Sequence, residues 1–210
     1  MTNQDGYLLI VEDVPDILEL LYETLKFKGY RVVTAKNGEE ALEAVQKERP
    51  ALIVTDILMP KMDGFNLVHK LRLDEQTREI PIVFLTATYV APEDKEFALT
   101  IGVTRFVEKP VDLEDFYPLI EELLNKGTPP PLKPLDEVDF YEGYKKRLET
   151  KLKHKNTQIV RDQHLLKSVQ DSQKTAFKAS MANTLREKEE IQGLLEDIRD
   201  KLDKLQKKEE

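Results

Sequence analysis

The sequence predicts an α/β fold, a doubly wound five-stranded parallel sheet, followed by an α-helical coiled-coil tail. In residues 1–126, short apolar runs alternate five times with amphipathic helical patterns, which is typical of a parallel sheet with helices on both faces. The stretch GTPPPLKP, residues 127–134, then interrupts the pattern, because proline favours extended chain. Residues 135–210 have neither strand-like runs nor proline, so we expect them to be helical.

The five strands are expected where β-branched and apolar residues form short runs bounded by turn residues. These runs are residues 7–11, 31–35, 52–55, 82–85 and 105–107. The helices between them are expected to end at glycine or proline, both of which disfavour further helix. Helical patterns follow Pro15 and Asn37-Gly38 and cover residues 65–73, 97–101 and 113–124.

The balance of acidic and basic residues also differs between residues 1–126 and the rest of the chain. Residues 1–126 hold 24 acidic and 14 Lys or Arg residues, whereas the remainder holds 16 acidic and 18 basic residues. A change of charge at a proline-rich stretch is typical of a domain boundary. We therefore predict a domain over residues 1–126, a linker over 127–134 and a helical dimerisation or output segment over 135–210.

Composition narrows the function classes. The chain contains no cysteine, which excludes disulfides, thiolate catalysis and cysteine-ligated zinc. No apolar run has the length of a membrane span, and the first residues, MTNQDGY, lack the basic and apolar parts of a secretory signal. We therefore expect a cytoplasmic protein that does not bind membranes.

The stretch LIVTDILMPKMDG, residues 52–64, carries the main candidate for chemistry. Its apolar run leads directly into Asp56, and Pro60 with Asp63-Gly64 prevents simple continuation of the strand. Asp56 is therefore expected at the carboxyl end of a strand, where parallel sheets collect ligands. Judged alone, Asp56 is better interpreted as an ordinary residue that ends a strand or caps a turn.

Other polar residues follow the remaining strands at the same edge. Glu12 and Asp13 follow the first strand, Thr86 follows the fourth and Lys109 follows the fifth. Clustered carboxylates repel one another unless a cation neutralises them, and a small set of oxygen ligands suits Mg²⁺. A lysine and a hydroxyl beside such a cation can stabilise a phosphoryl group in transfer.

Residues 5–125 resemble the receiver domain of two-component response regulators, which has a flavodoxin-like fold. The residues that carry the resemblance occur in the family's order and cover nearly its whole pattern. They are Glu12-Asp13, Asp56, Met59-Pro60, Met62-Asp63-Gly64, Thr86-Ala87, Phe106 and Lys109-Pro110.

The resemblance implies that Asp56 accepts a phosphoryl group from a phosphohistidine of a sensor histidine kinase or phosphotransfer protein. It implies Mg²⁺ ligation by Asp13, Asp56 and the backbone carbonyl of Leu58, with Glu12 helping through water. It also implies no enzymatic activity beyond self-dephosphorylation of the aspartyl phosphate.

Further roles are implied for the switch residues. Thr86 would hydrogen-bond the phosphoryl group, Lys109 would pair with it, and the Lys109-Pro110 peptide bond would be cis. A shift of Thr86 would let the aromatic ring at Phe106 turn inward. Phe106 replaces the family's commoner tyrosine, and Thr88 stands where a small residue is common, which suggests a phosphoryl lifetime sensitive to Thr88.

The tail carries heptad-like apolar spacing that leaves its arrangement open. The pattern is interrupted at Lys155 and Asp162 and changes register near Gln173. One arrangement is a continuous helix that forms a parallel dimer, and the other is a hairpin bent within residues 170–174. Residues 145–178 hold ten basic and three acidic residues while 184–210 hold seven and nine, which favours contact between the halves. The preferred interpretation is a dimeric coiled coil.

These observations predict a phosphorylation-dependent response regulator whose output is a protein-protein interaction or dimerisation of the tail. The tail could also be a spacer. An alternative is a transcription regulator that binds DNA through the basic helical tail, although no compact DNA-binding motif is visible. An aspartate-based phosphatase is disfavoured because such enzymes carry a second acid where this chain has Leu58.

Overall fold

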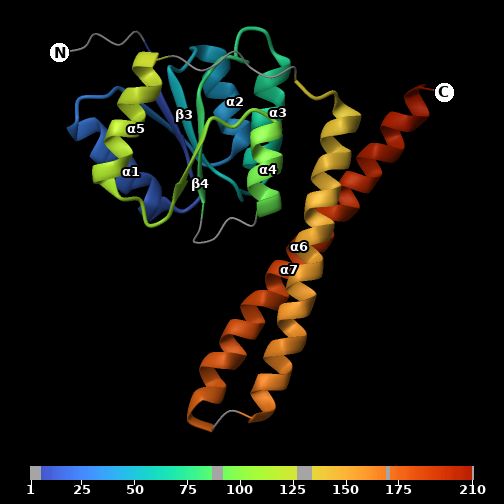
Figure 1. Cartoon of the computed structure of the whole chain (residues 1–210). Coiled ribbons are helices and arrows are strands. Elements are labelled where there is room, and N and C mark those ends of the chain that lie inside the picture. Colours follow the sequence, from blue (N-terminus) through green and yellow to red (C-terminus); the bar gives the residue numbers. More distant parts are fainter. Residues whose placement is uncertain (1–5, 87–91, 127–133, 169–170, 210) are drawn as a thin grey trace. The chain divides into compact units, whose positions relative to one another are not determined.

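The computed structural model describes residues 6–86, 92–126, 134–168 and 171–209 (Figure 1). The chain divides into two compact units, residues 1–135 and 136–210. Most of the expected linker, residues 127–133, lies outside the described residues.

The first unit is built on a parallel sheet of five strands in the order β2-β1-β3-β4-β5. All four neighbouring pairs are parallel, and the order reverses beside β1, so the sheet is doubly wound. The predicted α/β fold is therefore confirmed. The strands are β1 (Leu8–Val11), β2 (Val32–Ala35), β3 (Leu52–Asp56), β4 (Ile82–Thr86) and β5 (Arg105–Glu108).

Five helices cover the two faces of this sheet. In Figure 1, α1 and α5 lie on one face and α2, α3 and α4 on the other. This placement follows from right-handed crossovers that leave β1 in both directions. The helices are α1 (Pro15–Phe27), α2 (Gly38–Lys47), α3 (Gly64–Leu73), α4 (Pro92–Thr100) and α5 (Leu113–Lys126).

Side-chain caps fix where two of these helices begin. The Asn37 side chain accepts hydrogen bonds from the amides of Glu39 and Glu40, and Asp63 accepts one from the amide of Asn66. Such caps satisfy amides that have no partner within the helix. The start of α3 is thereby set by the same Asp63-Gly64 pair that stops the preceding strand pattern.

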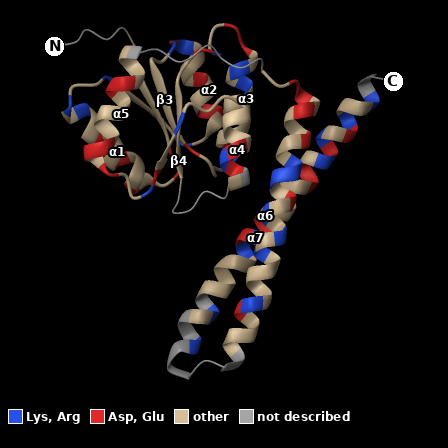
Figure 2. Ribbon diagram, in the orientation of Figure 1, with Lys and Arg blue, Asp and Glu red and all other residues tan. Residues whose placement is uncertain are grey.

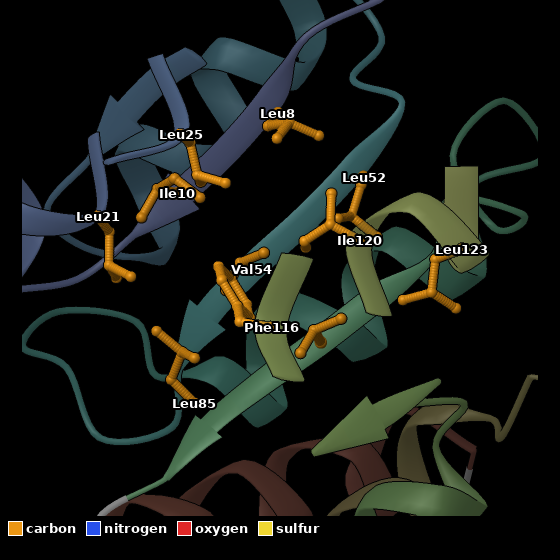
Figure 3. Packing of buried hydrophobic residues seen from close by; sticks show 11 residues of the cluster. Leu8, Ile10, Leu21, Leu25, Leu52, Val54, Leu85, Phe116, Ile120 and Leu123 are labelled. Carbon is orange, nitrogen blue, oxygen red and sulfur yellow. The ribbon is translucent and has the colours of Figure 1, made fainter. Parts of the chain in front are cut away.

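The core on the α1 and α5 side is aliphatic with one buried ring (Figure 3). Leucine and isoleucine side chains of α1 and α5 pack against alternate residues of β1, β3 and β4, as expected for strands whose side chains point to opposite faces. Phe116 is 1% exposed at the centre of this layer. The strands packed in this layer end at the edge where the polar residues gather.

The second unit consists of two long helices, α6 (Glu137–Ser168) and α7 (Asp171–Glu209). They pack as an antiparallel hairpin: Glu149 pairs with Arg199 at 3.6 Å, and Lys155 pairs with Glu187. The hairpin is one of the two arrangements left open by the sequence. The continuous helix of a parallel dimer, which was the preferred interpretation, is not formed, because α6 and α7 pack against each other. The register change expected near Gln173 lies close to the turn, whose residues 169–170 are outside the described range.

The side chain at one interruption of the heptad pattern is paired across this hairpin. Lys155, at a seam position, is the cation that meets Glu187 of α7.

Asp136, just before α6, accepts a hydrogen bond from the amide of Asp139 at 2.8 Å and so caps the helix. Among the helices that the structure describes, none combines the length and apolar character needed to cross a membrane.

Truncation of the central ring tests the packing. Phe116→Ala should lower the local free energy of unfolding in β1 and β3 by about 3–5 kcal/mol, since it removes a buried ring and leaves a cavity. Amide hydrogen exchange resolved by peptide measures this, with α7 as an internal reference. Leu20→Ala, at a position 62% exposed on α1, is the control and should change stability by less than about 0.5 kcal/mol. Equal effects of the two variants would contradict the assignment of this core.

Candidate functional site

The carboxyl ends of four strands bring the sequence-predicted residues to one edge of the sheet. Glu12 and Asp13 directly follow β1, Asp56 is the last residue of β3, and Thr86 is the last residue of β4. The register places Asp56 beside Leu85 and Thr86 beside Glu108. Lys109 comes directly after that last pair. The edge therefore collects carboxylates, a hydroxyl and an ammonium.

Lys109 holds two of the carboxylates together. Its Nζ donates to Glu12 Oε2 at 2.6 Å and to Asp56 Oδ1 at 2.8 Å. The three side chains are 17%, 0% and 13% exposed, respectively. Charge-assisted bonds with little water around them are strong and well oriented. Lys109 is thus paired at this edge with acids that lie 97 and 53 residues away in sequence.

Burial has the largest effect on the pKa of Glu12. Burial raises the pKa of the Glu12 carboxyl, the hydrogen bond from Lys109 opposes that rise, and the nearby Asp56 adds to it. Burial by itself lowers the pKa of Lys109, but its hydrogen bonds to Asp56 and Glu12 outweigh this, so that the Lys109 pKa is raised. The hydrogen bond between Glu12 and Lys109 therefore favours the charged form of both side chains.

The acids at this edge fit a divalent cation. Glu12, Asp13 and Asp56 each offer a carboxylate oxygen, and these atoms lie within 4.8 Å of one another. A few carboxylate ligands at a partly open edge suit Mg²⁺, which keeps several of its waters. The donor set therefore matches the ion implied by the sequence.

The loop after β3 orients Asp56. The amide of Leu58 donates to Asp56 Oδ2 at 3.1 Å, so each carboxylate oxygen of Asp56 has a donor. Gly64 folds back under this loop, and a Cβ at its position would lie 2.6 Å from the backbone carbonyl oxygen of Asp56. Only glycine permits that approach. The Asp63-Gly64 pair thus starts α3 and also leaves room for the backbone of Asp56.

The remaining residues expected at the switch are partly described. Thr86 is 5% exposed, and its carbonyl accepts a hydrogen bond from the Lys109 amide at 2.7 Å. The Phe106 ring is half-buried on β5 and meets the Phe84 ring edge to face at 6.0 Å. The Lys109-Pro110 peptide bond is cis, as the resemblance implied. Ala87 and Thr88 lie outside the described residues.

The match to a known family covers the whole sheet and this edge. The family described as "Response regulator receiver domain" matches residues 8–121. The chain belongs to the response regulator receiver family.

Two curated relatives of this receiver have names that refer to transcription. One is "Probable transcriptional regulator ycf27" of Pyropia yezoensis, 37% identical over 127 residues that make up 60% of this chain and 51% of the relative. Another is "Probable transcriptional regulatory protein TcrX" of Mycobacterium tuberculosis, 33% identical over 60% of this chain and 54% of that protein. The alignments with these two relatives span about half the length of each. Both are named as transcriptional regulators rather than as enzymes.

Solved receiver structures share the fold. Chemotaxis response regulator CheY4 of Vibrio cholerae is 34% identical, with a TM-score of 0.53 over 57% of this chain and 98% of that one. The receiver domain of a signal transduction histidine kinase from Syntrophus aciditrophicus is 33% identical, with a TM-score of 0.54 over 63% of this chain and 96% of that one. Receivers thus occur in differently organised signalling proteins.

The structure adds a buried cation that the sequence did not single out. Arg72 of α3 is 4% exposed and donates from Nη2 to the carbonyl of Gly102 at 2.8 Å, and burial lowers its pKa to about 10. Gly102 has φ of +96°, and a Cβ there would lie 2.8 Å from Arg72 Nε. From the sequence, Gly102 predicts only the end of a helix. Its second role, close approach to Arg72, depends on a contact 30 residues away.

Removal of the shared ammonium should expose the repulsion between the acids. Lys109→Met should lower the local free energy of unfolding in β1 and β3 by about 3 kcal/mol, because Glu12 would lose its buried partner. Saturating Mg²⁺ should recover part of that loss. Amide hydrogen exchange with and without Mg²⁺ measures both effects, and Lys47→Met, at an exposed position of α2, is the control. A Lys109→Met protein as stable as wild type without Mg²⁺ would show that the pairing contributes little.

The raised pKa of Glu12 predicts a pH dependence with a definite sign. A carboxyl whose pKa is higher in the folded state stabilises the fold below its unfolded pKa, and that contribution is lost as pH rises through the folded pKa. The stability of Glu12→Gln relative to wild type should therefore increase as pH rises from about 4 towards neutrality. Urea unfolding at a series of pH values, without Mg²⁺, measures the difference. A difference that does not change with pH would contradict the raised pKa.

Proposed function

We propose that this response regulator accepts a phosphoryl group on Asp56 from the phosphohistidine of a sensor kinase or phosphotransfer protein. The observation that carries the proposal is the hydrogen bond between Lys109 and Asp56, at a strand end where Glu12 and Asp13 lie close by. A carboxylate held by donors on both oxygens is oriented for attack. The membership of the receiver family supports the same reaction.

In the proposed transfer, a carboxylate oxygen of Asp56 attacks the phosphorus of the donor. An oxygen-phosphorus bond forms, and the phosphorus-nitrogen bond breaks with its electron pair remaining on the imidazole nitrogen, which takes up a proton. The product is an acyl phosphate on Asp56 and a free histidine on the donor. Most of the catalysis in such transfers is positioning and charge stabilisation.

The chain's own residues would divide that work. Lys109 would exchange its bond to Asp56 for one to a phosphoryl oxygen, and Thr86 would donate its hydroxyl to another. Glu12, Asp13, Asp56 and the carbonyl of Leu58 would hold Mg²⁺, which neutralises charge on the phosphoryl oxygens when bound. Phe106 would follow the movement of Thr86, because the two lie on neighbouring strands β4 and β5, two residues apart in register.

For the output, we propose that the helical tail dimerises or binds a downstream protein in response to the state of Asp56. The tail forms its own compact unit of two long helices. Long helices with exposed faces are common protein-binding elements. The cytoplasmic location expected from the sequence belongs to the same proposal.

A second candidate is a transcription regulator that binds DNA through the basic part of the tail, and the names of the relatives favour it. Between residues 145 and 178 the chain holds ten basic and three acidic residues. Contacts of lysines with phosphates would give affinity that falls steeply with salt but little sequence preference. Fluorescence anisotropy with operator-like and scrambled duplexes at two salt concentrations separates specific from non-specific binding.

Beryllofluoride with Mg²⁺, a mimic of the phosphoryl group, tests the acceptor. Wild type should show altered hydrogen exchange at the ends of β4 and β5 when the mimic is added, because Thr86 and Lys109 would change partners. Asp56→Asn should abolish the change, since the amide cannot bind the mimic as a carboxylate does. Light scattering on the same samples reports the mass of the full-length chain.

Asp115→Asn, which removes an exposed carboxyl of α5, is the matched control and should respond like wild type. A response that survives in Asp56→Asn would rule out Asp56 as the acceptor. A response at the sheet edge without any change in mass or partner binding would support Asp56 as the acceptor. It would count against the tail as the output element.

A further inference from the structure

The seam between α6 and α7 leaves apolar residues outside it. Asp162 and Thr184 are 8% and 4% exposed in the middle of the hairpin, where an apolar core would be expected. Val160 and Leu185, by contrast, are 55% and 39% exposed. Two helices bury only one stripe each, so a surface formed by the exposed residues has no cover within the hairpin.

Val160 and Leu185 lie on the same side of the hairpin. Each follows a buried seam residue by one place, Val160 after Ile159 and Leu185 after Thr184. In an antiparallel pair the helices run in opposite directions and face each other, so residues one place after the seam point to the same side. Glu149 and Arg199 also follow buried seam residues by one place, and their ion pair at 3.6 Å shows this geometry directly.

The two apolar residues also lie at the same level along the hairpin. The pairs Glu149–Arg199 and Lys155–Glu187 fix which parts of the helices are opposite each other. Counting from these pairs places Val160 opposite residues between 182 and 188. Leu185 is in the middle of that range, and the exposed Ala182 lies one turn away. We call this surface the Val160–Leu185 face.

The hairpin is polarised in charge along its length (Figure 2). Its turn half, residues 151–186, holds eight basic and two acidic residues, a net charge of +6. Its open half, residues 136–150 with 187–210, holds nine basic and fourteen acidic residues, a net charge of −5. Two copies aligned turn to turn would repel, whereas two copies aligned turn to open end would attract.

We propose that the Val160–Leu185 face binds a second copy of this chain in antiparallel orientation, so that two hairpins form a four-helix bundle. The two-fold axis would pass beside Val160 and Leu185, and each would pack against its own counterpart, as in an isologous interface. The inference specifies the dimer of the proposed function and rests on that function only for the link to Asp56.

Charged residues of α7 support this orientation. Lys178 lies on the face one heptad from Leu185 towards the turn, whereas Glu189 and Glu196 lie on the face towards the open end. A two-fold axis at Leu185 places Lys178 opposite residue 192 of the second copy, between its Glu189 and Glu196. On α6 the positions one heptad either side of Val160 are both lysine, Lys153 and Lys167, so the orienting ion pairs come from α7.

Cysteine cross-linking of the full-length chain tests the axis. The natural chain has no cysteine, so Leu185→Cys introduces a single thiol. Under oxygen with a copper catalyst, two such thiols beside the axis should lose two electrons and two protons and form a disulfide-linked dimer. Leu165→Cys is the matched control: Leu165 is similarly exposed, at 41%, but precedes the seam residue Leu166 and so lies on the opposite side.

Reversible dimerisation gives a second measurement on variants that need no oxidation. Leu185→Asp should weaken the dimer by roughly tenfold or more, as expected for a central apolar contact, while Leu165→Asp should not. Lys178→Glu should also weaken it, and the double variant Lys178→Glu/Glu189→Lys should recover affinity because the ion pair is reversed between copies. Sedimentation over a concentration series measures all four, and circular dichroism checks that the helices remain folded.

A full-length chain that stays monomeric, or that assembles only on an acidic protein or nucleic acid, would overturn the proposed interface. Equal cross-linking through positions 165 and 185 would overturn it as well. Cross-linking only in a Val160→Cys/Leu185→Cys variant would indicate the parallel arrangement instead. None of these measurements uses the phosphoryl mimic, so their failure is distinct from failure of Asp56 as the acceptor.

Discussion

The organisation of the first unit depends on one ammonium group between two carboxylates. Glu12 is fully buried and Asp56 nearly so, and neither could be kept there as an anion without a cation. Lys109 can reach both because β5 and β3 end at the same edge as β1. The sheet order brings these three groups together, and the glycine under Asp56 leaves room for its backbone. Lys109 therefore neutralises part, but not all, of the negative charge that Glu12, Asp13 and Asp56 bring to the site.

Much of the sheet and the identity of its polar edge could be predicted because each depends on local pattern. Apolar runs identified the strands, and the topology of parallel strands alone brought Glu12, Asp56, Thr86 and Lys109 to one edge. The bridging of Glu12 and Asp56 by Lys109 could not be predicted, because side-chain pairing depends on distances that spacing does not fix. The burial of Arg72 against Gly102 escaped prediction for the same reason: its meaning comes from tertiary contact.

The tail shows the opposite situation. Its heptad spacing is compatible with a partner helix from the same chain or from another copy, since both bury the same stripe. In the structure the partner is a helix of the same chain, and the two helices are joined by ion pairs such as Lys155–Glu187, whose energies are individually small. The receiver has a deep apolar core with a polar edge, whereas the hairpin has a thin seam and much exposed surface. In the first unit the fold is determined by the burial of apolar side chains. In the second unit the pairing of the helices is determined by the placement of charged side chains.

The antiparallel course of the tail has an evolutionary consequence. The start of α6 and the end of α7 lie at one end of the hairpin, and the turn lies at the other. Insertion of seven residues into each helix would preserve the seam and move the turn by about 10 Å, while the attachment to the rest of the chain would stay in place. The length of the two helices can therefore change by whole heptads in evolution without a change at Asp56.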